Sequence, residues 1–203
     1  MNIHFIMKVL KQTTRAGILL FLMLLPIKGF TQVTPFTADS IPVVNGEVVF
    51  TVDYEQDLTK HELHKRVFHY LNSGLNPYSG GFLASNNDST MAVITDYLVM
   101  KSNVLSVFAM YMTYHLTLHY MDGKCQLTIS NITFMEKGYF ETLEKSDREL
   151  NMPEYSGKAI FVDKEYSTLT IRRASEKITE EALERINEVI QSIGHSLSEE
   201  VNV

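Results

Sequence analysis

The clearest pattern in this chain is the alternation of apolar and polar residues around Asp122-Gly123. A two-residue turn of type I′ at this dipeptide sets one register for the two flanking strands. In that register the apolar pairs are Tyr120 with Cys125, Leu118 with Leu127 and Leu116 with Ile129. The polar pairs are His119 with Gln126, Thr117 with Thr128 and His115 with Ser130. One apolar and one polar face predict a half-buried antiparallel sheet, and a change of phase after Ser130 predicts a bulge.

Further strands are predicted on both sides of this hairpin. Residues 43–54 are rich in valine and contain an early Asn45-Gly46 turn, and residues 82–86 and 90–101 are separated by a polar turn. Residues 158–162 and 168–172 favour a short extra hairpin.

Two helices are predicted from capping residues and from apolar residues at helical spacing. The first follows Thr59, with Glu62 placed for a capping box. Its apolar arc is formed by Leu63, Val67, Phe68, Tyr70 and Leu71. His64 falls within that arc, which favours a packed core histidine.

The second helix is predicted near the C-terminal end, with Thr179 as its cap and Gly194 near its end. Its buried stripe consists of Leu183, Ile186, Ile190, Ile193 and Leu197.

This order of elements predicts an α+β fold. A curved antiparallel sheet with two helices on one face forms a two-layer sandwich. We expect a single domain over residues 32–203 with its core at about 41–195. Residues 136–157 form a charged insert without a steady period, which we expect to be mobile apart from a short helix.

The first 31 residues have the pattern of a signal peptide. Lys8, Lys11 and Arg15 precede an apolar run at residues 17–25, and the small residues Gly29 and Thr31 lie where cleavage requires them. The apolar run is about half as long as a membrane-spanning helix. The sequence therefore predicts an exported protein, periplasmic or secreted, without membrane insertion after the leader is removed.

Charge and cysteine content narrow the range of partners. The chain has 18 basic and 24 acidic residues, and four of the basic ones belong to the leader. The remaining 14 basic and 24 acidic groups give a net charge of −10, which disfavours nucleic acid and anionic lipid. Cys125 is the single cysteine, so no disulfide forms within the chain, and we expect it to be buried beside Tyr120.

Several segments together resemble a family of exported proteins from Gram-negative bacteria. They are the Thr-Gln step at residues 31–32, the opening IPVVNGEVVF and the helix start Leu-Thr-Lys-x-Glu-Leu. The family is a domain of unknown function with a fold like that of the TATA-box-binding protein, and the likeness covers about residues 41–195. The resemblance implies a curved sheet with helices on one side and supplies no catalytic residues. It does not imply DNA binding, because that role needs basic residues on the sheet, whereas the polar face here reads Tyr111, Thr113, His115, Thr117 and His119.

The candidate binding residues are Tyr111, His115 and His119 on the polar face of the predicted hairpin. Residues four apart in a strand are about 13 Å apart, so one metal ion is not held by both histidines. The segment His61-Glu-Leu-His64 lacks the spacing of zinc proteases. We therefore predict no metal or cofactor. A merely solvated sheet face remains the alternative for the three residues.

Two further features bear on function. Ser40 and Ser89 each lie in an Asp-Ser-apolar or Asp-Ser-Thr triplet, which resembles an O-glycosylation signal of exported proteins. No nucleophile elbow, phosphate loop or dinucleotide fingerprint is present. We expect a non-catalytic binding module for a protein or glycan partner. The alternative is a periplasmic hydrolase that uses carboxylates with His115 or His119.

Overall fold

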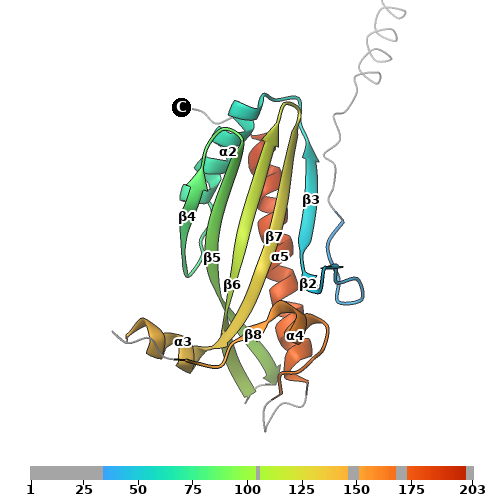
Figure 1. Cartoon of the computed structure of the whole chain (residues 1–203). Helices are drawn as coiled ribbons and strands as arrows, with labels where there is room; N and C mark the ends of the chain where they lie inside the picture. The colour runs from blue at the N-terminus through green and yellow to red at the C-terminus, as the bar shows by residue number, and fades with distance from the viewer. Residues whose placement is uncertain (1–33, 104–105, 146–150, 168–172, 200–203) are drawn as a thin grey trace, which may run out of the picture. The chain divides into compact units, whose positions relative to one another are not determined.

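The structure is a computed structural model that describes residues 34–103, 106–145, 151–167 and 173–199 (Figure 1). The predicted signal peptide lies outside the described residues. The strands are β1 (Val43–Val44), β2 (Glu47–Val48), β3 (Phe50–Glu55), β4 (Ser79–Ser85), β5 (Ser89–Asn103), β6 (Ser106–Met121), β7 (Lys124–Glu136) and β8 (Tyr155–Ser156). The helices are α2 (Lys60–Ser73), α3 (Lys137–Glu144), α4 (Gly157–Phe161) and α5 (Ala174–Ser198).

The main sheet is antiparallel, with the order β3-β7-β6-β5-β4 and with β8 paired to β7. The two short strands β1 and β2 form a separate hairpin through Asn45 and Gly46, whose φ angles are 52° and 87°. The segment predicted as one strand therefore divides at its predicted turn. The α+β sandwich predicted from the sequence is confirmed.

The register predicted for the central hairpin is confirmed at all six pairs, from Tyr120 with Cys125 to His115 with Ser130. The predicted turn type is wrong. A type I′ turn needs positive φ at both central residues, and Asp122 is not among the described non-glycine residues with positive φ, whereas Gly123 has φ +82°. The bulge after Ser130 is confirmed: the register shifts between Thr113 and His115, and Asn131 has φ 50°.

Helices α2, α4 and α5 pack against one face of the sheet, behind it in Figure 1. The buried side chains of that face form a single core with the apolar stripe of α5, and Cys125 and Tyr120 lie within it at 0% and 3% exposure, as predicted. We call this the covered face. None of the helices in the described ranges is long and apolar enough to span a membrane.

Helix α5 is longer at both ends than predicted. It begins at Ala174, so Thr179 is not its cap; the Thr179 hydroxyl instead donates to the Ser175 carbonyl at 2.8 Å within the helix. Gly194 does not end it either. The Tyr54 hydroxyl donates to the Ile190 carbonyl at 2.7 Å, and a Cβ at Gly194 would lie 3.1 Å from the Tyr54 ring. The glycine therefore makes room for an aromatic ring inside the helix.

Helix α2 has the predicted start but a different buried arc. The Thr59 side chain accepts a hydrogen bond from the Glu62 amide at 3.3 Å. Arg66 is buried although it lies outside the predicted apolar arc, and Phe68 is 38% exposed although it belongs to that arc. The reason is tertiary: the Arg66 guanidinium donates to the Leu197 carbonyl at 2.8 Å, and so satisfies a carbonyl in the last turn of α5.

One prediction for the region after β7 is wrong. Residues 158–162 do not form a strand, because residues 157–161 form α4, capped by the Ser156 hydroxyl at 3.2 Å from the Ala159 amide. Residues 168–172 lie outside the described residues. Helix α3 corresponds to the short helix expected in the insert, but it contacts β6 and β7 on the face opposite to the other helices. The two helices predicted to pack on one face, α2 and α5, do so, and α3 is an additional helix on the other face.

Candidate functional site

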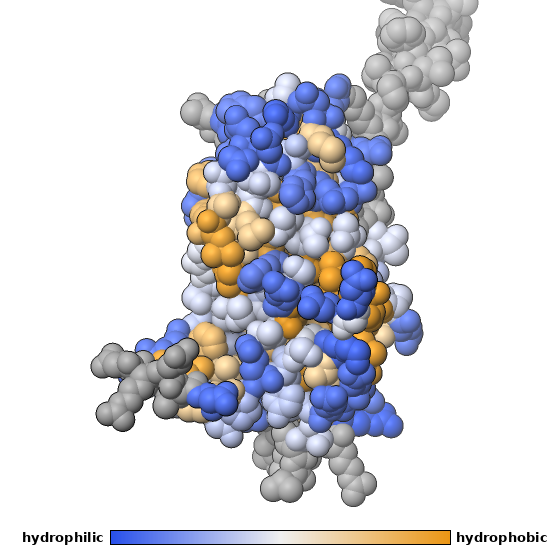
Figure 2. Space-filling model, in the orientation of Figure 1, coloured by the Kyte–Doolittle hydropathy of each residue, from blue (hydrophilic) through white to orange (hydrophobic). Residues whose placement is uncertain are grey.

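The sheet face opposite α2 and α5 carries the predicted binding residues. We call it the open face and define it by Thr113, His115, Thr117 and His119 of β6 and their neighbours on β5 and β7. Most of these side chains are partly exposed and bear hydroxyl, amide or imidazole groups. Figure 2 looks onto this face and shows weakly polar and hydrophilic colours over its middle, with an apolar patch over β4 and β5, where Leu83 and Met91 are exposed.

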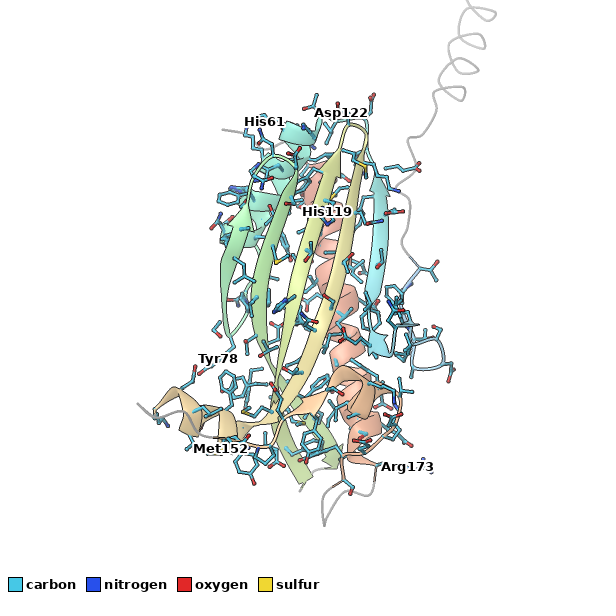
Figure 3. All side chains as sticks on the ribbon, in the orientation of Figure 1. His61, Tyr78, His119, Asp122, Met152 and Arg173 are labelled. Carbon is cyan, nitrogen blue, oxygen red and sulfur yellow. The ribbon has the colours of Figure 1, made fainter. Side chains whose placement is uncertain are left out.

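His115 and His119 lie on the open face as predicted. The amide nitrogen of Asn131 is 3.1 Å from Nδ1 of His115, so Nδ1 accepts this bond and the proton of the neutral imidazole lies on Nε2. His119 is exposed and opposite Gln126, near the turn at Asp122 (Figure 3). The Gln126 amide donates to Asp53 at 2.8 Å. The histidines thus have amide and hydroxyl neighbours.

Tyr111 does not lie on an open surface. It is 3% exposed, because Phe140 of α3 stacks on it at 4.0 Å and the Tyr78 ring packs edge-on at 4.6 Å. Burial, together with the neighbouring Tyr78, raises the pKa of Tyr111 above its ordinary value. The structure therefore leaves His115 and His119 on the open face and assigns Tyr111 to the attachment of α3.

A hollow of about 370 Å³ lies at the edge of the sheet next to this tyrosine. The pairing of β4 with β5 begins at Ser79 and Thr95, so β4 does not cover residues 96–98 of β5. Residues 76–78 of the loop before β4, residues 96–98 and Arg185 of α5 line the space, which we call the edge hollow. Tyr78, labelled in Figure 3, lies at the same end of the sheet as α3.

A buried ion pair forms the floor of the edge hollow. The Asp96 carboxylate is 3.0 Å from both Nε and Nη2 of Arg185 and accepts a hydrogen bond from Tyr114 at 2.9 Å. Arg185 also donates to Glu188 at 2.7 Å. Burial alone would lower the pKa of Arg185, but its hydrogen bonds with Asp96 and Glu188 raise it above the ordinary value. Asp96 is the acidic member of a small group of polar residues on the covered face, where it is 4% exposed.

A second depression of about 460 Å³ follows the outer surface of α2 and includes His61, His64 and His69. His64 is packed as predicted, with its ring 5.5 Å from that of Tyr120 and Nε2 3.0 Å from the Ser85 hydroxyl, but it is half-buried and does not lie in the core. Partial burial and the neighbouring His61 lower the pKa of His64. Within the described ranges, no three His, Cys, Asp or Glu side chains are grouped as a metal ion would require.

The two predicted modification sites differ in exposure. Ser40 is exposed in a turn with Thr37, and its hydroxyl is 3.0 Å from the Thr37 hydroxyl. Ser89 is half-buried at the start of β5, and its amide donates to the side chain of Asn86 at 3.0 Å. Exposure therefore favours Ser40 over Ser89 for any enzyme that modifies the folded protein.

Sequence reasoning missed the edge hollow and assigned no role to Asp96. One signal was available: Asp96 is the only charged residue in the strand run from Thr90 to Met100. Its partner Arg185 gave no signal, because it lies 89 positions away among the many charges of α5.

Comparisons with known proteins agree with this architecture. Residues 51–135 match the domain of unknown function DUF4468, which has a TBP-like fold. A DUF4468 family protein from Bacteroides ovatus is similar in structure, with a TM-score of 0.62 at 14% identity, over 83% of this chain and 95% of that one. A TBP-like protein from Parabacteroides distasonis has a TM-score of 0.55 at 11% identity, over 77% and 96% of the two chains.

No curated protein matches the sequence. At these identities the solved structures bear on the fold and leave the function open. The matched segment runs from β3 to the end of β7 and so contains the sheet that carries the open face. Residues 51–135 of this chain are thus similar to the DUF4468 family, and the chain shares the TBP-like fold with these two proteins.

Proposed function

We propose that this chain is an exported, non-catalytic binding protein and that the open face of its sheet is the binding surface. The observation that carries the proposal is the chemistry of that face. On β6 and β7 it presents closely spaced neutral groups, which are the hydroxyls of Thr113, Thr117 and Thr128 and the imidazoles of His115 and His119. Such a surface suits an uncharged or weakly charged partner that offers its own hydrogen-bonding groups.

The rigidity of the surface supports the same proposal. The side chains project from paired strands, and the Thr95 and Thr113 hydroxyls are 3.0 Å apart across β5 and β6. The Asn131 amide holds the His115 ring so that its Nε2–H remains for a ligand. Groups that are already positioned lose little conformational entropy on binding, which favours affinity from a modest number of contacts.

The net charge of −10 expected after leader removal supports a partner other than nucleic acid. In a TBP-like fold a nucleic-acid interface on the sheet would need basic side chains there, whereas the middle of this open face carries threonine, serine and histidine. The partner would therefore be a protein or a glycan.

Export is tested with the full chain expressed in a Gram-negative host. Mass spectrometry of the soluble protein from the periplasm or medium should find a mature N-terminus near Gln32. A soluble product that retains Met1 would contradict export.

Binding is tested by capture of envelope components on the immobilised mature protein, with wild type and His115→Ala/His119→Ala compared side by side. If these imidazoles are hot spots, the double variant should bind a captured component with at least about 1 kcal/mol less affinity. The control is Glu184→Ala/Gln191→Ala, because both residues are exposed on α5, in the helix layer. Equal affinity of the two double variants would remove these histidines from the binding surface.

A further inference from the structure

Each face of the sheet has one residue that differs in polarity or burial from the other side chains of that face. Both residues lie at the edge hollow. Asp96 is a carboxylate on the covered face, and Tyr111 is a buried aromatic on the open face. Asp96 lines the edge hollow, and Tyr111 packs against Tyr78 and Tyr97, which line it too. Departures from local pattern that converge on one concave site are typical of functional sites.

The walls of the edge hollow are two exposed aromatic rings. Tyr78 is 47% exposed and Tyr97 is 39% exposed. Both rest on Tyr111, at centroid distances of 4.6 and 5.0 Å, and Tyr78 also donates from its hydroxyl to Glu144 at 2.7 Å. The rings are thus fixed from behind while part of their surface faces solvent. Tyrosine presents a large contact area at low cost in conformational entropy.

The floor and rim supply polar groups whose positive charges are paired with carboxylates. Lys137 lies over the Tyr97 ring, with Nζ 5.3 Å from the ring centroid, and pairs with Glu141 at 3.7 Å. Asp96 and Arg185 neutralise each other, and Glu188 adds a negative charge on the far side of Arg185. The five N–H groups of a guanidinium exceed what these two carboxylates use, so Arg185 retains donor capacity. The side chain of Asn76 adds an amide at the rim. This set disfavours an anionic ligand and offers both donors and acceptors to a neutral one.

We propose that the edge hollow binds a neutral sugar residue. A pyranose ring has a face of C–H groups that stacks on an aromatic ring and an edge of hydroxyls that both donate and accept hydrogen bonds. Tyr97 or Tyr78 receives the C–H face, while Asn76, Arg185 and the carboxylate of Asp96 bond the hydroxyls. The volume of about 370 Å³ falls in the range of small-molecule sites. The site is separate from His115 and His119, so it stands independently of the function proposed above.

The test uses the folded chain and four neutral trisaccharides: maltotriose, cellotriose, mannotriose and triacetylchitotriose. Saturation-transfer difference NMR should show transfer to the ring protons of at least one of them. Tyr97→Ala should weaken that binding by about fivefold or more, and Asn76→Ala should weaken it by a smaller factor.

The matched control is Tyr139→Ala. Tyr139 is also 39% exposed, but it lies on α3 outside the lining of the hollow, so its removal should leave sugar binding unchanged. Circular dichroism of the three variants confirms that each is folded. Transfer to none of the four sugars would overturn the proposal. Equal losses in Tyr97→Ala and Tyr139→Ala would overturn it as well, as would binding of a proline-rich peptide at the hollow with no binding of the sugars.

Discussion

The covered and open faces of the sheet are built from the same strands, yet they serve different purposes. On β6, Leu116 and Leu118 are fully buried against the helices, while the alternating Thr117 and His119 are partly or wholly exposed. Burial of the apolar side chains supplies most of the folding free energy. The side chains of the open face contribute less to that free energy, because they remain partly exposed. The difference teaches that packing on one side of these strands supplies the stability and leaves the other side available for the binding proposed above.

The largest contrast between the faces is expected in thiol reactivity. Burial on the covered face, with a smaller contribution from Asp53, raises the pKa of Cys125 to about 12 from an ordinary value of 9.0. At neutral pH this leaves roughly a thousandfold less thiolate, and thiolate is the reactive form. A thiol reagent should therefore modify native Cys125 only as fast as the protein unfolds. The comparison variant Gln126→Cys adds a thiol on the open face, which should react at once; rapid modification of wild type would refute the placement of Cys125.

The largest contrast in stability is expected between neighbours on β6. Leu118→Ala removes a side chain with 0% exposure and should lower the free energy of unfolding by about 2–5 kcal/mol, because it leaves a cavity. Thr117→Ala, on the open face, should change it by less than about 0.5 kcal/mol. Urea unfolding followed by circular dichroism measures both. Similar losses in the two variants would mean that the open face also carries stability.

Asp96, the carboxylate on the covered face, should behave as one member of a buried ion pair. Asp96→Ala leaves Arg185 without its carboxylate and should cost about 3 kcal/mol, somewhat less than for a fully buried partner because Arg185 is 18% exposed. The double variant Asp96→Leu/Arg185→Met should recover a large part of that loss, since it removes both charges. No recovery in the double variant would indicate that the pair is needed for more than charge balance.

Tyr111, the buried tyrosine on the open face, should hold α3 in place. Tyr111→Ala removes the ring on which Phe140 stacks and should cost about 2 kcal/mol, below the value for a residue of the central core. Amide hydrogen exchange should rise in residues 137–144 and stay unchanged in α5. Unchanged protection of α3 would show that other contacts hold it.

The smallest effect is expected from the pH dependence of His64. Its pKa is lowered in the folded state, so the unfolded chain takes up this proton first as the pH falls below about 6.5. Stability from His64 is therefore complete above that pH and declines toward pH 5. His64→Gln should remove this contribution. The measurement is the difference in unfolding free energy between the two proteins at pH 7.5 and pH 5; a constant difference would contradict it.

The sequence by itself determined the local features of this fold. The alternation around Asp122-Gly123 fixed the pairing of β6 with β7, because a slip of one residue would turn every apolar side chain toward solvent. Thr59 capped α2, and the stripe of α5 was readable at helical spacing. Each of these depends on neighbours within a few positions along the chain.

Only the tertiary structure decided what lies over each face. Alternation correctly placed Tyr111 on the face of His115, but α3 comes from a later segment and covers it. Asp96 is a charged residue in an otherwise uncharged strand run, and the sequence does not show that Arg185, 89 positions away, neutralises it. Arg66 is buried because the last turn of α5 supplies its acceptor. Period and capping report the direction of a side chain, whereas its burial and its partners depend on contacts between segments that are distant in sequence.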